Sequence, residues 1–409
     1  MVASGIPHHV RAAVRAAAAG SHRGGAALSA YFYDVDELTA RARSMRAVLP
    51  DAVEIFYAVK ANSHPAVLGA LVPRVTGFEI ASGGELDKVR AVAPGVPLIL
   101  NGPGKSDAEI ARFLRVAGGD LINAESVHDL HRIDWFAGRA GVRAQVLIRV
   151  NRGDARVAGS HRMAGAATQF GIDPADLDEA VGRARRLRGI AVRGLHLHSV
   201  SNCTDAAAYL DFVGGCMRFA RELEARYGLP LPVLDVGGGF GVDYSGGAAG
   251  FDLRLLAEGL RKPPPTRVIL EPGRFLAAPC GYYAAEVLDL KRSHGVAFAV
   301  VRGGTHHFRL PAAWRHSHPF AVVPIEDWPH PYPRPILTDA ALTVAGELCT
   351  PNDVLARDSR VDRIRAGDVL VFPLAGAYAW EISHHDFLSH PHPEIIVVSR
   401  PPGVRGRPA

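Results

Sequence analysis

The stretch FYAVKANSHP (residues 56–65) runs from an apolar, strand-like segment into a lysine and then into polar residues. Lys60 is one of five lysines in a chain whose lysines and arginines total 46. An arginine stays protonated, whereas a lysine amine can lose its proton and act as a nucleophile. A lysine at the end of a buried strand therefore indicates covalent chemistry. A surface lysine, whose stem lies along apolar residues, is the alternative.

The pattern of an apolar run that ends in a polar or glycine residue repeats along the chain. The runs are VEIFYAVK, GFEIAS, PLILNG, DLINAES, QVLIRVN, VRGLHLHS, VLDVGGGF and RVILEPG. Helical stretches rich in Ala, Leu and Arg separate them, and such alternation predicts a parallel sheet. About eight repeats over roughly 220 residues predict a (β/α)₈ TIM-type barrel, with a doubly wound sheet as the alternative.

The polar residues at the ends of these runs predict where a site lies. They are Lys60, Ser82, Asn101, Glu125, Arg149, His198, Gly237–Gly239 and Glu271. In a barrel of this kind the active site is built at the carboxyl ends of the strands and from the loops that follow. We therefore expect these residues to gather at that end of the barrel.

After residue 285 spaced strand patterns with Gly and Pro turns replace the helical stretches. They predict a second, mostly antiparallel β domain. The expected divisions are an N-terminal extension with a short Ala-rich helix (1–27), a strand joining the β domain (28–44), the barrel (45–285), the β domain (286–400) and a frayed tail (401–409).

Composition excludes several classes of protein. Of 409 residues, 48% are apolar and 21% are charged, which is typical of a globular protein. Basic runs interleaved with aromatic residues are lacking, so nucleic-acid binding is not favoured, and no apolar run approaches the length of a membrane span. Four cysteines without a CxxC pair indicate free thiols and a cytoplasmic location.

Two glycine-rich stretches, LDVGGGFG (234–241) and LEPGR (270–274), end the seventh and eighth predicted strands. Backbone amides exposed by glycine, beside the arginine of the second stretch, can bind phosphate, and TIM-type barrels often do so at this point. A tight turn also requires glycine, which is the structural alternative. A phosphate site together with Lys60 suggests pyridoxal phosphate, whose aldehyde a lysine amine can hold as a Schiff base.

Other residues suit the pyridine ring of that cofactor. Glu271 lies beside the phosphate residues and could keep the ring nitrogen protonated, which favours reactions through a carbanion. His198, in HLHSVSN, could stack on the ring, and Ser201 could donate to the phosphate. Because residues two apart in a strand share a face, either His196 or His198 could instead be a core histidine.

The chain resembles the fold type III pyridoxal-phosphate decarboxylases, which include ornithine, arginine-biosynthetic and diaminopimelate decarboxylases. The resemblance rests on seven motifs in order: FYAVKAN, FEIASGGEL, HLHSVSN, LDVGGGFG, EPGR, GELCTPNDVL and GAY. It implies a barrel followed by a β domain, a decarboxylase that acts on a small molecule derived from an amino acid, and a homodimer with shared active sites.

The resemblance also implies a role for each matching residue. Lys60 would hold the cofactor, His198 would stack on its ring and Glu271 would pair with its nitrogen. Cys349 would come from the partner subunit and protonate the substrate carbon after CO₂ leaves; taken alone, it reads as a small buried thiol. The remaining cofactor-binding residues would be Glu79, Arg149, Ser201, Gly239, Gly273, Arg274 and Tyr378.

The chain departs from ornithine and diaminopimelate decarboxylases where those enzymes bind the distal end of the substrate. Thr350 follows the cysteine in place of an acid, and Arg302 replaces an acidic residue of the β domain. The next segment carries further basic residues: His306, His307, Arg309, Arg315, His316 and His318. A cationic cluster of this kind would repel a distal ammonium group.

The segment GGTHHFRLPAAW resembles the siderophore-assembly branch of the family, similar to the staphyloferrin B-type decarboxylases. Their substrates are amino acids condensed with a polycarboxylic acid such as citrate, so we expect a citryl–diamino-acid conjugate. The candidate substrate-binding residues are Arg302, His306, His307, Arg309 and Thr350. Diaminopimelate or ornithine/lysine decarboxylation is one alternative, and a non-catalytic regulatory relative is another.

Two features of the sequence are not explained by the proposed cofactor and substrate sites. The segment HHDFLSHPHPE (384–394) carries four possible zinc ligands: His384, Asp386, His390 and His392. Their spacing fits no standard closed site, so no metal is expected. Gln169 stands where relatives carry a lysine that pairs across the dimer, which leaves Asp353 without that partner.

Overall fold

The computed structural model of the chain describes residues 5–117, 119–153, 161–162, 167–245, 250–261 and 267–400. The chain divides into two compact units. The first unit consists of Met1–Leu38, Asp243–Ala248 and Leu276–Ala409, and the second consists of Thr39–Val242 and Ala249–Phe275. The expected tail (401–409) lies outside the described residues.

The second unit is a parallel barrel. In the described part of the chain, eight strands close in the order β10–β11–β2–β3–β4–β5–β6–β8. Their bounds are β2 Val53–Ala58, β3 Gly77–Ile80, β4 Leu98–Leu100, β5 Leu121–Ala124, β6 Ala144–Arg149, β8 Ile190–His196, β10 Val233–Asp235 and β11 Arg267–Leu270. Each apolar run singled out in the sequence forms one strand, so the predicted barrel is confirmed and the doubly wound alternative is wrong.

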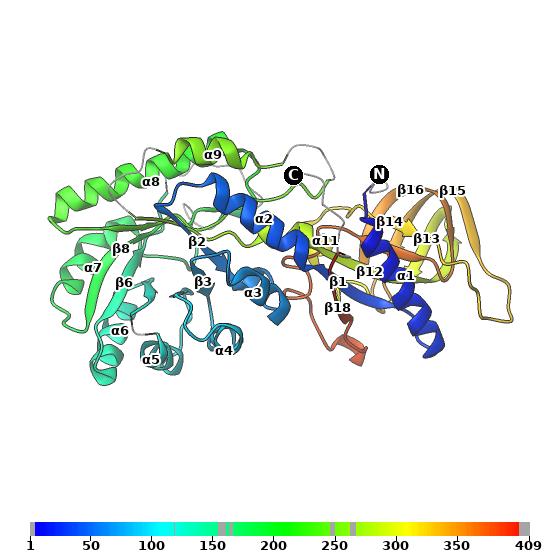
Figure 1. Ribbon diagram of the computed structural model, residues 1–409, viewed down its shortest axis with the longest axis horizontal. Coiled ribbons are helices and arrows are strands. Elements are labelled where there is room, and N and C mark those ends of the chain that lie inside the picture. The colour runs from blue at the N-terminus through cyan, green and yellow to red at the C-terminus, as the bar shows by residue number, and fades with distance from the viewer. Residues whose placement is uncertain are drawn as a thin grey trace. The chain divides into compact units, whose positions relative to one another are not determined.

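Burial explains why these runs lack strand-like alternation. Six strands contribute to one hydrophobic cluster: Phe56, Ile99, Leu121, Leu147, Val233 and Ile269. Helices cover the outer side of the strands, as Figure 1 shows, and most strand residues on both faces are buried. The helices of this unit are α2 Val35–Val48, which starts in the first unit, α3 Pro65–Leu71, α4 Gly83–Val92, α5 Asp107–Val116, α6 Val127–Ala140, α7 Leu177–Ala184, α8 Ala206–Tyr227 and α9 Leu253–Gly259.

Serine side chains fix where three of these helices begin. Ser82, Ser106 and Ser126 each accept a hydrogen bond from the backbone amide three residues later. Ser106 also forms a reciprocal capping box with Glu109. Ser82 therefore acts as a helix cap, although the sequence analysis placed it among the polar strand ends.

The first unit is a mixed, mostly antiparallel sheet, which confirms the predicted β domain. Its strands run in the order β14–β17–β12–β13–β15–β16, and β1 pairs with β12 and β18. The β1–β18 and β13–β15 pairs are parallel. The bounds are β1 Ser29–Asp34, β12 Gly281–Ser293, β13 Val296–Val301, β14 Ala321–Val323, β15 Ile336–Ala345, β16 Val354–Arg365, β17 Val369–Phe372 and β18 Glu394–Val398, with a short helix α11 at Leu310–Trp314.

The N-terminal helix is part of this unit's core. Helix α1 (His8–Arg23) buries one face, with a spacing of four residues: Val10, Val14 and Ala18. His9 lies 2.8 Å from a carboxylate oxygen of Asp34, and His22 lies 2.8 Å from one of Glu286. The segment expected as an extension therefore packs on the sheet, and these contacts lie near both ends of the helix.

The boundary after the barrel also differs from the expected residue 285. Leu276 onward belongs to the first unit, because strand β12 begins at Gly281 and already pairs with β1 and β17. None of the described helices combines the length and the apolar character needed to span a membrane.

Candidate active site

Lys60 lies in a 3₁₀ turn (Val59–Ala61) directly after β2. Its amine donates hydrogen bonds to both carboxylate oxygens of Glu79, at 2.9 and 2.8 Å. Glu79, on the neighbouring strand β3, is fully buried, whereas the side chain of Lys60 is 45% exposed. A buried carboxylate thus orients an amine that a small aldehyde can still reach. This arrangement favours the nucleophile over the surface-lysine alternative.

A chain of hydrogen bonds connects Glu79 with Glu271 across the barrel. Asn101, directly after β4, donates from Nδ2 to Oε1 of Glu79 at 2.9 Å and to Oε1 of Glu271 at 3.0 Å. Asn123 donates to Oδ1 of Asn101 and lies 2.8 Å from Nδ1 of His196. Because the amide nitrogen is a donor, Nδ1 of His196 accepts, and the neutral ring carries its proton on Nε2. His196 is thus the core histidine of the pair.

Glu271 also lies close to Asp235, the last residue of β10. One ligand atom each from His196, Asp235 and Glu271 lies within 4.8 Å of the others, and all three residues are buried. Burial raises the pKa of Asp235 to about 7 and that of Glu271 well above its usual value, which the charge of Asp235 raises further. The two carboxyl groups therefore do not both ionise at neutral pH. Their spacing would also suit a metal ion.

His198 follows β8 and lies against the glycine turn. Its ring centre is 6.3 Å from that of His196, with 20° between the ring planes. Burial, and then the charge of Arg149, lowers the pKa of His198 to about 3, so the ring is neutral. A Cβ on Gly237 (φ +69°) would lie 2.3 Å from Nδ1 of His198. A flat, neutral ring held in this way suits stacking on an aromatic cofactor.

The glycine turn after β10 packs against the segment after β11. The amide of Glu271 donates to the carbonyl of Gly237 at 2.9 Å. A Cβ on Gly238 would lie 2.2 Å from the carbonyl oxygen of Glu271, and Gly239 has a φ of +104°. Arg274, 4% exposed, follows this segment. The two glycine-rich stretches are therefore adjacent, as a shared phosphate site requires.

Arg149, at the end of β6, is a fixed positive charge. Its Nη1 donates to Oε1 of Glu125 at 2.9 Å, and its guanidinium lies 4.6 Å from the ring centre of Phe170. Both members of the ion pair are buried. The charge of Arg149 is the second cause, after burial, of the lowered pKa values of His196 and His198.

The predicted cofactor residues fall in both units. The barrel unit contains Lys60, Glu79, Arg149, His198, Ser201, Gly239, Glu271, Gly273 and Arg274, and the first unit contains Tyr378 and Cys349. Asn123 and Asp235 were not singled out from the sequence. The sequence feature that could have revealed them is a polar residue inside an apolar run, DLINAES for Asn123 and VLDV for Asp235.

Two residues of the first unit have unusual environments. Cys349 is exposed, which contradicts a buried core thiol. Tyr378 has a left-handed backbone (φ 52°), a conformation that is rare for aromatic residues and that clusters at functional sites.

Asp353 does not depend on the missing lysine. Its carboxylate oxygens accept hydrogen bonds from the backbone amides of Thr305 at 2.6 Å and Leu348 at 2.9 Å. The side chain is 1% exposed, and Gln169 is exposed. Asp353 is therefore satisfied within its own chain.

A histidine cluster surrounds Glu347 in the first unit. Arg302 donates to Oε2 of Glu347 at 2.6 Å, while His306 and His390 each place a ring nitrogen 3.7 Å from Oε1. The ring of His307 lies 4.0 Å from that of His306. Burial lowers the pKa of His306 to about 4 and that of His307 to about 3. The cluster predicted to be cationic therefore contains neutral imidazoles and an arginine that already has a carboxylate partner.

The other basic residues of this segment differ in role. His318 is buried, its Nε2 donates to the carbonyl of Pro373 at 2.7 Å, and burial lowers its pKa to about 3. It is a core residue. Arg309 is exposed. The remaining candidate substrate-binding residue, Thr350, lies outside this segment and is half-buried.

Two of the four possible zinc ligands pair with each other, and the other two have different neighbours. His392 bonds to Asp386 at 2.7 Å, His390 faces Glu347, and His384 packs against a phenylalanine ring.

The barrel site fits pyridoxal phosphate. Lys60 offers an oriented amine, and Gly238 closes a turn in which a side chain would collide with backbone. Among the described residues, Nε2 of His196 and Oδ2 of Asp235 are buried without a hydrogen-bond partner. A protonated ring nitrogen beside Glu271 would offset the negative charge of this buried carboxylate pair.

Comparison with known proteins agrees with this geometry. Residues 35–278 match the family model described as "Pyridoxal-dependent decarboxylase, pyridoxal binding domain". A Staphylococcus aureus protein, 2-[(L-alanin-3-ylcarbamoyl)methyl]-2-hydroxybutanedioate decarboxylase, is 38% identical over 90% of this chain and 94% of its own. An L-glutamyl-[BtrI acyl-carrier protein] decarboxylase from Niallia circulans is 30% identical over 90% of this chain and 88% of its own.

A solved structure shows the same fold. Diaminopimelate decarboxylase from Helicobacter pylori, complexed with L-lysine, is similar with a TM-score of 0.80 at 24% identity, covering 93% of this chain and 94% of that chain. An oriented lysine, a buried carboxylate pair and a glycine turn meet at the carboxyl ends of a parallel barrel, and relatives match over nine-tenths of the chain. The chain therefore belongs to the pyridoxal-phosphate-dependent decarboxylases of fold type III, the family that its motifs indicated.

Proposed function

We propose that this enzyme decarboxylates an amino acid whose distal end is joined through an amide to a polycarboxylate, as a step in the biosynthesis of a carboxylate siderophore. The observation that carries the proposal is the similarity to the S. aureus enzyme. Its name describes an alanine unit joined through carbon 3 and an amide to a hydroxydicarboxylate. The match covers 90% of this chain and therefore includes most of the β domain.

The histidine cluster supports a substrate without a free distal ammonium group. Glu347, the carboxylate nearest in sequence before Cys349, is already paired with Arg302. The neutral rings of His306 and His307 offer hydrogen-bond donors and acceptors without a net charge. Carboxylate, hydroxyl and amide groups can use such partners, whereas Glu347, paired with Arg302, is not free to offset the charge of an ammonium group.

The barrel residues take the following roles in the proposed reaction. Pyridoxal phosphate, when bound, supplies the electron sink for the electron pair that the departing carboxylate leaves behind. Lys60 holds the cofactor through its amine, which Glu79 orients. Glu271 would keep a positive charge on the ring nitrogen of the bound cofactor, and His198 would pack on the ring. The thiol of Cys349 then gives a proton to the substrate carbon.

The glycine-rich turns at the carboxyl end of the barrel would hold the phosphate of the cofactor. The proposed ligands are Ser201, Gly239, Gly273, Arg274 and Tyr378. Arg149 lies on the cofactor side as a fixed cation. In this arrangement the backbone amides of the turns provide donors, and Arg274 provides the compensating charge.

We further propose a cytoplasmic homodimer in which each active site takes Cys349 from the partner subunit. The exposure of this thiol supports the assignment. Lys60→Ala and Cys349→Ala are each expected to be nearly inactive. When equal amounts are dissociated and reassociated together, half of the dimers are mixed and carry one intact site, so activity should return to about a quarter of the wild-type value. No recovery would contradict the shared site.

Substrate competition tests the proposed activity. CO₂ release should be measured with a citryl amide of 2,3-diaminopropionate, with the free diamino acid, and with ornithine, lysine and diaminopimelate. We expect kcat/KM for the amide to exceed kcat/KM for every free diamino acid by at least about 100-fold. A higher value for any free diamino acid would overturn the substrate assignment while leaving the decarboxylase assignment intact.

A matched pair of variants locates the specificity. His306→Gln should raise KM for the citryl amide, because it changes a buried member of the histidine cluster. His330→Gln, at an exposed position of the same unit, is the control and should leave KM unchanged.

A further inference from the structure

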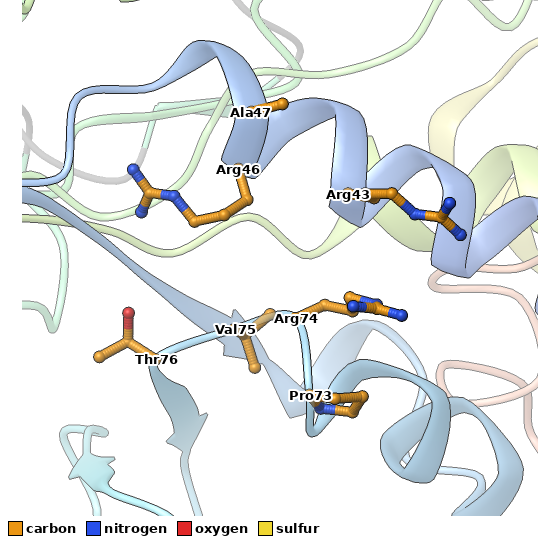
Figure 2. A pocket seen from close by; sticks show the side chains of 7 residues that line it. All are labelled: Arg43, Arg46, Ala47, Pro73, Arg74, Val75 and Thr76. Atoms are coloured by element: carbon orange, nitrogen blue, oxygen red, sulfur yellow. The ribbon is translucent and has the colours of Figure 1, made fainter.

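The barrel unit has a cavity whose lining includes none of the candidate active-site residues. It has a volume of about 390 Å³ and is lined by Arg43, Arg46 and the segment 73–76. Figure 2 shows helix α2 on one side of the cavity and the segment that leads into strand β3 on the other. Ligand pockets start at about 300 Å³, so the size suits a small molecule.

This cavity lies at the opposite end of the strands from the candidate active site. Residues 73–76 directly precede β3, and Arg46 donates to the carbonyl of Val53 at the start of β2. Lys60, by contrast, follows the end of β2. In a parallel barrel the starts and ends of neighbouring strands lie at opposite faces. A molecule in this cavity is therefore not a substrate at the site described above.

The lining carries three arginines and no acidic residue. Arg46 donates to the carbonyls of Leu49 and Pro50 as well as Val53, and these neutral acceptors leave its charge uncompensated. In the part of the chain that the structure describes, the guanidinium groups of Arg43 and Arg74 form no ion pair. The carboxylate of Glu54, the residue after Val53, is paired with Arg267 at 2.5 Å.

Arg74 gives an independent sign of a missing partner. Its Nε is buried and, among the described residues, has no hydrogen-bond acceptor. A buried N–H without an acceptor is unfavourable, so such groups are nearly always paired with protein, water or ligand. In Figure 2 the guanidinium groups of Arg43 and Arg74 extend to the same side of the cavity. Both arginines line the same cavity, so one anion bound there would offset their charges and could accept from the unpaired donor.

Thr76 adds a further donor at the other end of the cavity. Its hydroxyl accepts a hydrogen bond from the amide of Ile55 at 3.2 Å, which leaves the hydroxyl hydrogen available. In Figure 2 this side chain and the guanidinium of Arg46 lie toward the same end. The lining thus presents N–H and O–H donors without a competing carboxylate.

We infer that this cavity binds a small oxyanion with two or more negative charges, either inorganic phosphate or a polycarboxylate. The forked geometry of guanidinium groups matches the oxygens of both classes, whereas chloride offers no such match. The inference stands on the residues of the cavity and is independent of the substrate proposed for the active site.

Calorimetric titration of the holoenzyme tests the inference, because bound cofactor occupies its own phosphate site. Sodium phosphate and sodium citrate are titrated separately, with sodium chloride at equal ionic strength as the reference. The variant is Arg43→Gln combined with Arg74→Gln. Arg115→Gln, at an exposed position of helix α5, is the matched control. Circular dichroism and basal decarboxylation should be unchanged in all variants.

We expect saturable binding of at least one of the two anions to the wild type and to the control. The double variant should bind it at least about tenfold more weakly. Saturating anion should also raise Tm by about 2–4 °C in the wild type and not in the double variant. If only citrate binds, the ligand of the cavity is a polycarboxylate. If only phosphate binds, the ligand is inorganic phosphate.

Two results would overturn the inference. One is the absence of saturable binding by both anions. The other is equal affinity in the double variant, as expected for citrate that enters only the active site.

Discussion

Replacing Asp235 by asparagine should stabilise the cofactor-free protein most at alkaline pH. Burial raises the pKa of Asp235 in the folded protein from 3.8 to about 7. Between these pH values the unfolded chain has released its proton while the folded chain retains it, so the free energy of unfolding falls as the pH rises. The pKa difference corresponds to about 4 kcal/mol, which is lost in full above pH 7. Asparagine cannot ionise and escapes this loss.

The substitution is otherwise conservative. Asparagine matches aspartate in size, and its Oδ1 can keep the hydrogen bond that Oδ1 of Asp235 accepts from the amide of Gly237 at 2.8 Å. The assay is denaturation by guanidinium chloride at pH 5 and pH 8. We expect the stability advantage of Asp235→Asn to be about 2–3 kcal/mol larger at pH 8. Asp211→Asn, at an exposed position of α8, is the control. An advantage that is equal at both pH values would refute the reasoning.

Three further predictions concern other residues of the two units. Gly238→Ala places a methyl carbon 2.2 Å from the carbonyl oxygen of Glu271. We therefore expect a loss of about 1–3 kcal/mol in the free energy of unfolding and weaker cofactor binding. Denaturation measures the first and an absorbance titration the second, and unchanged values would contradict the close packing. Glu79→Gln removes the charge that orients the amine of Lys60 and should lower kcat by at least about tenfold in a folded protein, as steady-state kinetics and circular dichroism can establish. Because burial lowers the pKa of His318 to about 3, the unfolded chain takes up a proton first and stability falls as the pH drops below 6.5. His318→Gln should reduce the dependence of the free energy of unfolding on pH between pH 6 and pH 4 by about 1.4 kcal/mol per pH unit. Denaturation at several pH values measures this dependence, and the same dependence in the variant and the wild type would show that the ring is not held neutral.

The barrel could be predicted because its signal is local. A strand buried on both faces needs a continuous apolar run, and the residue that ends the run lies at the carboxyl end of the barrel. Lys60, Arg149 and Glu271 could be located by this rule alone. Ser82 follows the same rule and is a helix cap, because the rule identifies a position and not a partner.

The charge of the histidine cluster could not be predicted because it depends on burial. In the sequence, His306 and His307 count as basic residues near Arg302. In the structure both rings are buried, which lowers both pKa values, and for His306 the loss of solvation outweighs the attraction of the neighbouring Glu347. Residues far apart in the chain bring about this burial, as shown by the hydrogen bond at 2.8 Å between His307 and Ser29.

The balance of charge at the carboxyl end of the barrel indicates why the cofactor and the reaction belong together. Among the described residues, the amine of Lys60 is bound to Glu79, and Arg149 has a buried carboxylate partner of its own. In the described part of the chain no cation contacts Asp235 or Glu271, and burial, followed for Glu271 by the charge of Asp235, raises their pKa values. A protonated pyridine nitrogen would bring the missing positive charge to this position, where the buried pair would hold it on the ring. A ring that keeps this charge stabilises a carbanion, which is what loss of CO₂ from an amino acid requires.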